Sequence, residues 1–221
     1  MGRQPTLGYV APFAAYVGLL ALGRLVSVAP LVVHAARLLI VLAVILAWSR
    51  RFLSLRPTST LASAAVGFAV FLIWIGPDLL FQYRHSWIFE NTLTGRAATD
   101  LAPALEHDRF FLTIRMLTTA GLVPVLEELF WRGWLMRWLI DSRDFQKVPL
   151  GTYSTMAFWV VAVLFASEHG PYWEVGLLAG IVYNWWLVRT RSLADCILAH
   201  AVTNAALGFY VITAGAYQYW L

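Results

Sequence analysis

Apolar residues fill seven long windows of this sequence, and polar connections separate the windows. A helix of about 20 apolar residues crosses the ~30 Å hydrocarbon layer of a bilayer. The windows cover residues 8–28, 30–49, 61–81, 110–140, 152–167, 174–188 and 192–214. This pattern predicts an all-α fold, a polytopic membrane helical bundle with seven transmembrane helices, or eight if one window divides.

The fourth window is too long for one ordinary span. Gly121 and Pro124 interrupt it, and this predicts either a kinked helix or two shorter helices.

The windows predict a single membrane domain over residues 1–221. Residues 1–109 form its N-terminal spans and a loop, and residues 110–214 form a core that contains the polar clusters described below. The connection 82–109 is the one long loop. Its aromatic and acidic residues indicate that it is ordered against the membrane surface.

Charged residues make up 13% of the chain and hydrophobic ones 60%, whereas soluble domains average roughly 25% charged residues. The net charge of +4 does not indicate a nucleic-acid partner, because the basic residues lie beside the apolar windows, where they set topology. Those after the second, fourth and sixth windows are Arg50, Arg51, Arg56, Arg137, Arg143, Lys147, Arg189 and Arg191. We therefore expect a multi-pass integral protein of a bacterial inner membrane, with its N-terminus in the cytoplasm.

Three ionisable side chains, Glu127, Glu128 and Arg132, fall inside the fourth window. Each charge at the bilayer centre costs at least about 2.5–3.5 kcal/mol, so such groups usually serve a function. Glu128 and Arg132 are i,i+4 partners on one helix face, and Glu127 is rotated about 100° away from Glu128. The spacing predicts that Glu128 is neutralised by Arg132 and that Glu127 is available as a base.

Two more polar pairs interrupt apolar windows. His169 lies one turn after Phe165 at the end of the fifth window, and Asn204 lies one turn after His200 in the seventh. A buried glutamate suits general-base catalysis on a water molecule. His169 suits a proton partner or a metal ligand, and His200 with Asn204 suits the stabilisation of an oxyanion.

Together the three motifs resemble those of the CPBP family of intramembrane proteases (CAAX protease and bacteriocin-processing, or Abi). The motifs are Glu127-Glu-Leu-Phe-Trp-Arg132, Phe165-x-x-x-His169 and His200-x-x-x-Asn204. Their order and spacing match, and the resemblance covers roughly residues 110–210.

The resemblance implies an intramembrane endopeptidase that cleaves a membrane-associated peptide or protein. It implies Glu127 as the water-activating base and His169 as its partner. It also implies His200 and Asn204 as oxyanion stabilisers, with Glu128 and Arg132 in support.

Cofactor and class remain open at this point. Members of the family are labelled metalloproteases, and a metal-free glutamate mechanism is also argued for them. Two His and two Glu side chains suit zinc with an open position, whereas Asn is a poor zinc ligand, so no cofactor is assigned. The sequence leaves oligomeric state open, and a proton-coupled carrier or a non-catalytic immunity or scaffold member are the alternative functions.

Other polar residues receive structural interpretations. Glu168 departs from the family pattern; it either tunes His169 or faces water at the end of its span, and we expect the second. Asn184 and Asp195 are assigned to packing and span-end roles, and Cys196 to a packed structural thiol.

Overall fold

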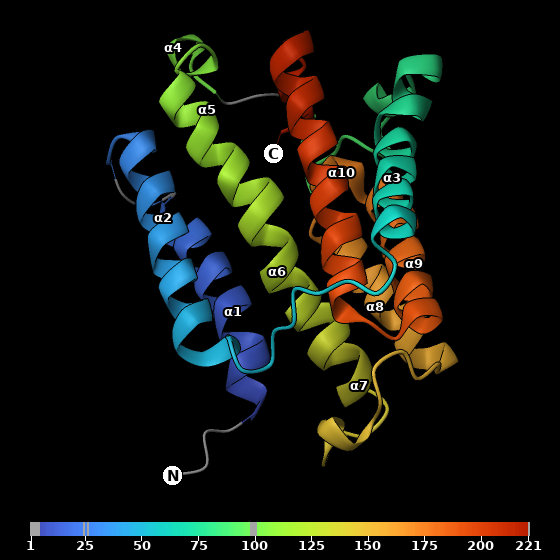
Figure 1. Ribbon diagram of the computed structural model, residues 1–221. Coiled ribbons are helices and arrows are strands. Elements are labelled where there is room, and N and C mark those ends of the chain that lie inside the picture. The colour runs from blue at the N-terminus through green and yellow to red at the C-terminus, as the bar shows by residue number, and fades with distance from the viewer. Residues whose placement is uncertain (1–4, 24, 26, 98–100, 221) are drawn as a thin grey trace.

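The computed structural model describes residues 5–23, 25, 27–97 and 101–220, which form a bundle of helices running up and down side by side (Figure 1). The long single helices are α1 (Pro5–Gly23), α2 (Pro30–Val44), α3 (Thr60–Phe81), α8 (Thr155–Ser167), α9 (Trp173–Thr190) and α10 (Leu193–Ala214). A composite helix contains α5 (Arg109–Met116), α6 (Val123–Glu128) and α7 (Met136–Trp138), and the short α4 (Pro103–Glu106) precedes it. Short 3₁₀ turns lie at Tyr83–His85, Phe145–Lys147, Gly170–Tyr172 and Tyr217–Tyr219. No β-strand occurs in the described residues, which confirms the predicted all-α class.

The fourth predicted span is one continuous helix of 30 residues, Arg109–Trp138, so the alternative of two shorter helices is wrong. The backbone widens into π-helical turns at Leu117–Leu122 and Leu129–Leu135, on either side of α6. Pro124 lies inside this continuous helix, two residues after the first π-helical segment, and its missing N–H removes one backbone hydrogen bond there. π-helical turns are frequent at functional sites, and these two flank the predicted glutamates.

Five helices of the described chain are long and apolar enough to cross a membrane: Pro5–Gly23, Pro30–Ser49, Thr60–Phe81, Arg109–Trp138 and Leu193–Ala214. All seven predicted windows form helices, and five of these helices have the length and hydropathy of a full span. α8 has 13 residues, which is about 20 Å of helix and too short for the hydrocarbon layer. α9 has 18 residues but carries polar groups along its length, and it packs closely on α8. The protein is an integral membrane protein in which α8 and α9 pack against each other.

The connections rich in basic residues lie toward one end of the bundle. The start of α1 and the α2–α3, α7–α8 and α9–α10 connections all lie in the lower part of Figure 1. This agrees with the distribution of arginine and lysine along the sequence, and the cytoplasmic location of that end stays a prediction.

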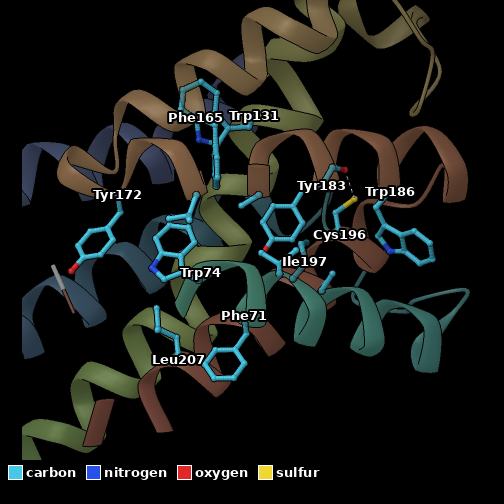
Figure 2. Packing of buried hydrophobic residues seen from close by; sticks show 14 of the residues in the cluster. Phe71, Trp74, Trp131, Phe165, Tyr172, Tyr183, Trp186, Cys196, Ile197 and Leu207 are labelled. Atoms are coloured by element: carbon cyan, nitrogen blue, oxygen red, sulfur yellow. Dashed lines mark hydrogen bonds between the residues drawn. The ribbon is translucent and has the colours of Figure 1, made fainter. Parts of the chain in front are cut away.

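An aromatic core joins α3, α8, α9 and α10. Figure 2 shows Trp74, Phe165 and Tyr183 converging in it, and the last two side chains are fully enclosed. Cys196 is also buried, and its thiol donates to the carbonyl of Tyr183 at 3.7 Å. This contact fits the structural role predicted for the thiol.

The close approach of α3 and α10 depends on Gly67. The hydroxyl of Thr203 donates to the Gly67 carbonyl at 2.7 Å. A Cβ atom on Gly67 would overlap the carbonyl oxygen of Ala199 and would lie 2.9 Å from Cβ of Val202. The two backbones therefore meet where only glycine fits.

We expect Gly67→Ala to lower the free energy of unfolding by about 1–3 kcal/mol, because the helices must move apart. Gly76→Ala on the same helix is the matched control, since its Cβ would meet nothing within 4 Å. Alanine there should be neutral or stabilising by up to ~1 kcal/mol. Thermal unfolding in detergent measures both, and equal melting temperatures for the two variants would contradict this view of the contact.

Candidate functional site

A cavity of about 140 Å³ lies among α3, α6, α9, α10 and the turn after α8. Four of the six predicted site residues line it, namely Glu127, His169, His200 and Asn204. The remaining wall is mostly apolar and aromatic, and it includes Trp74, Val123, Phe165, Ala179, Tyr183, Leu207, Tyr219 and Trp220. A water molecule takes about 30 Å³ of liquid, so the cavity has room for water together with a small polar group.

The other two predicted residues form a buried salt bridge below this cavity. Both side chains are fully buried, and Nη1 of Arg132 lies 3.1 Å from Oε1 of Glu128. Nε of Arg132 donates to the side-chain oxygen of Asn184 at 2.9 Å, and Nη2 donates to the carbonyl of Gly180 at 3.3 Å. Asn184 donates in turn to the carbonyl of Phe158 at 2.8 Å. Arg132 thus ties the composite helix to α9 and, through Asn184, to α8.

Glu128 also holds His200, a contact that the sequence analysis did not predict. Nδ1 of His200 lies 2.9 Å from Oε1 of Glu128. A salt-bridged carboxylate accepts hydrogen bonds, so Nδ1 of His200 carries the hydrogen. The ring of Tyr183 stacks on the imidazole at 5.0 Å, and its hydroxyl donates to Thr203 at 2.8 Å. His200 is therefore held at one ring edge by Glu128 and on one ring face by Tyr183, and its Nε2 atom remains available.

Glu127 has no such partner. Its Oε2 atom is buried without a hydrogen bond among the described residues, and it lies 4.0 Å from Nε2 of His200. By contrast, the buried carboxylate of Asp195 accepts hydrogen bonds from Thr58, Ser59 and Ser63 at the start of α3, in keeping with its predicted structural role. Of these two carboxylates, only Glu127 lines the cavity with an oxygen that makes no hydrogen bond among the described residues.

His169 reaches the cavity because α8 is short. The helix ends at Ser167, and a tight turn follows, so the imidazole is placed within the bundle rather than at its end. Nδ1 donates to the carbonyl of Phe165 at 2.7 Å; a carbonyl only accepts, so in the neutral ring Nε2 keeps its lone pair. Gly176 makes room for the ring, since a Cβ there would lie 3.0 Å from its Cγ and Nδ1 atoms.

Asn204 points its amide toward the first π-helical turn. Nδ2 donates to the carbonyl of Thr119 at 2.8 Å, and this contact identifies the nitrogen end of the amide. The amide carries a second N–H, and both residues line the cavity.

The structure brings all six predicted residues together, four on the cavity wall and two behind it. Sequence reasoning missed Tyr183, and it gave Asn184 only a packing role, although both contact site residues. The adjacent Tyr-Asn pair in the middle of an apolar helix was the available signal. Glu168 is exposed beside His169, as expected from its span-end position.

The described residues form no recognisable cluster of metal ligands. No group of three or more His, Cys, Asp and Glu side chains placed to hold a metal ion occurs in the part of the chain that the structure describes. Glu128 and Nδ1 of His200 are hydrogen-bonded to each other. The ring of His169 packs against that of Trp74, with 5.2 Å between the ring centroids. No step of the chemistry below is routed through a metal.

Fold and site together define a polytopic helical membrane protein with a carboxylate, two imidazoles and an amide around one internal cavity. Residues 109–206 match the family described as Type II CAAX prenyl endopeptidase Rce1-like. The match covers a little less than half of the chain, from α5 into α10, and contains all six site residues. The match agrees with the resemblance to CAAX proteases that the three motifs carry. No curated protein and no solved structure matches the chain.

We expect Arg132→Met to lower the free energy of unfolding by about 3–5 kcal/mol, because it leaves Glu128 buried without its cation. The double variant Glu128→Leu/Arg132→Met should lose less than Arg132→Met alone, since it removes both charges. Thermal unfolding in detergent measures each loss. Strictly additive losses in the double variant would show that the two charges do not depend on each other.

Proposed function

We propose that the protein is an intramembrane endopeptidase in which Glu127 activates a water molecule to hydrolyse a peptide bond of a membrane-associated substrate. The observation that carries this proposal is a buried carboxylate oxygen, Oε2 of Glu127, that makes no hydrogen bond among the described residues and shares a cavity with two imidazoles and an amide. The match of residues 109–206 to a family of endopeptidases supports the reaction class.

The base side of the cavity consists of two acceptors. Glu127 offers its unbonded Oε2, and His169 offers Nε2, since its Nδ1 is committed to a backbone carbonyl. A water molecule between them donates one hydrogen to each, which leaves an oxygen lone pair for attack on the substrate carbonyl. As the new C–O bond forms, Glu127 takes one proton from the water.

The opposite side consists of donors. Asn204 offers its second amide N–H, and His200 donates through Nε2 when its ring is doubly protonated. The Glu128 carboxylate at Nδ1 of His200 stabilises that imidazolium. These donors stabilise the negative charge on the tetrahedral oxygen. The proton held by Glu127 then passes to the leaving nitrogen as the C–N bond breaks, so a carboxylic acid and an amine are released.

The cavity wall indicates the kind of peptide that enters. Trp74, Leu207 and Trp220 surround the polar groups, so apolar residues next to the scissile bond fit the wall. The segment with Trp220 is held over the cavity, because Tyr172 donates to the carbonyl of Gln218 at 2.8 Å. We propose an apolar C-terminal or juxtamembrane segment as substrate, and prenylated and unprenylated versions of one membrane-tethered peptide would compare the two forms.

Glu127→Gln should reduce the cleavage rate by at least ~10²-fold, because the amide cannot accept the proton of the water. Its melting temperature should stay the same or rise, since no hydrogen bond to Oε2 is lost. Asp144→Asn is the control; its ion pair with Lys147 is exposed and remote. The assay uses purified protein in vesicles with tethered peptides. Full-rate cleavage by Glu127→Gln, or electrogenic uptake without proteolysis by the wild type, would overturn the proposal.

Asn204→Ala should lower kcat by ~10²–10³-fold with little change in KM, because the lost N–H acts on the transition state. Thr213→Ala, on an exposed face of the same helix, should leave kcat unchanged. A rise in KM at constant kcat in Asn204→Ala would instead assign the amide to substrate binding.

A further inference from the structure

Residues 86–95, which follow α3, form a compact turn that exposes large apolar side chains outside every helix. Leu93 is 95% exposed and Trp87 is 79% exposed. The neighbouring end of α3 exposes Leu80 and Phe81 in the same way. The turn therefore continues an apolar surface that begins on a membrane-spanning helix.

This exposure is imposed by a rigid backbone. The side-chain oxygen of Asn91 accepts the N–H groups of Leu93 and Thr94 at 2.9 and 3.1 Å. Its amide nitrogen donates to the carbonyl of Trp87 at 2.9 Å, and the Thr94 hydroxyl donates to the carbonyl of Phe89 at 2.6 Å. A turn whose polar groups bond internally can enter the poorly hydrated edge of a bilayer at low cost, and Trp is a typical residue of that edge.

A buried arginine fixes the start of the turn to the bundle. Arg84 is 2% exposed and forms salt bridges with Glu174 at 2.7 Å and Asp78 at 3.5 Å. Tyr83 donates to the same Glu174 at 2.8 Å; burial and this hydrogen bond raise the pKa of Tyr83 to about 12, so the phenol remains a donor at physiological pH.

The far side of the turn rests on the segment that carries His169. The carbonyl oxygen of Thr94 lies so close to Gly170 that a Cβ there would be 2.9 Å from it, and Gly170 has φ of +49°. Phe89 stacks on Trp173 at 5.9 Å, and the Trp173 indole donates to the carbonyl of Ile88 at 3.4 Å. The turn thus contacts the residues that immediately follow His169.

We propose that residues 86–95 insert into the bilayer interface through Trp87 and Leu93, and that this insertion fixes the turn that positions His169. The lipid surface is the occupant because the large exposed side chains of the turn are apolar, include Trp, and continue the apolar surface at the end of α3. The second half of the proposal rests on the proposed function, whereas the first half does not.

The insertion of residues 86–95 into the bilayer interface is tested by a fluorescence measurement of depth in the membrane. A single exposed cysteine is introduced as Leu93→Cys, since the native Cys196 is buried, and it is labelled with an environment-sensitive dye. The protein is placed in vesicles of phosphatidylcholine and phosphatidylglycerol. Quenching by a nitroxide near the top of the acyl chain is compared with quenching by aqueous iodide. Lys147→Cys, at a side chain that is 80% exposed near the opposite end, is the control.

The proposal expects the Leu93→Cys dye to be blue-shifted, quenched by the lipid nitroxide and protected from iodide, with the reverse at Lys147→Cys. Iodide quenching of equal strength at the two positions would overturn the membrane insertion. Protection of the Leu93→Cys dye from iodide only after a protein is added would assign the surface to a protein partner instead.

Coupling to His169 is tested by Leu93→Ser combined with Trp87→Ser. Cleavage should show a lower kcat with unchanged KM and melting temperature. Leu61→Ser, 87% exposed at the other end of α3, should leave kcat unchanged. Equal kcat in the double variant and the wild type would overturn the coupling. If the wild type cleaves no peptide, the proposed function fails, while the fluorescence result still decides whether residues 86–95 insert into the membrane interface.

Discussion

The arrangement of this site depends on a guanidinium that must be fully paired inside an apolar bundle. Arg132 satisfies that requirement with Glu128, Asn184 and the carbonyl of Gly180, and the rings of Phe165 and Tyr183 cover it at 4.5 and 5.4 Å. Glu128 lies one turn earlier on the same helix, and Asn184 and Gly180 both lie on α9, so the buried cation joins the composite helix to α9 and, through Asn184, to α8. A low dielectric makes both the pairing and any failure of it energetically large.

The division of labour between the two adjacent glutamates follows from this network. Glu128 is committed to Arg132 on one side and to Nδ1 of His200 on the other. Glu127, one residue earlier, points away from the network and keeps an unbonded oxygen at the cavity. The helix geometry that separates neighbouring side chains by about 100° thus yields one structural and one available carboxylate. The short α8 supplies His169 to the same space.

Much of this could be read from the sequence, because it depends on local spacing. Charges within an apolar window and an i,i+4 pair predicted the salt bridge, and one-turn spacing placed His200 and Asn204 on one face. The bond between Glu128 and His200 could not be predicted, since it joins residues on two helices whose register is set by π-helical turns and by Gly67. Hydropathy alone could not predict that α8 ends early, after 13 residues. Asn184 looked like an ordinary packing residue, because only the position of Arg132 gives its amide a charged partner.

The most direct measurement of the central claim is a high-resolution density map of the protein in lipid, recorded without substrate. The account predicts an ordered water molecule within hydrogen-bonding distance of both Oε2 of Glu127 and Nε2 of His169, with Nδ1 of His200 on Glu128. A metal ion at ~2.0–2.2 Å from Glu127 and a histidine nitrogen, or a Glu127 carboxylate hydrogen-bonded to an arginine or lysine side chain, would contradict it.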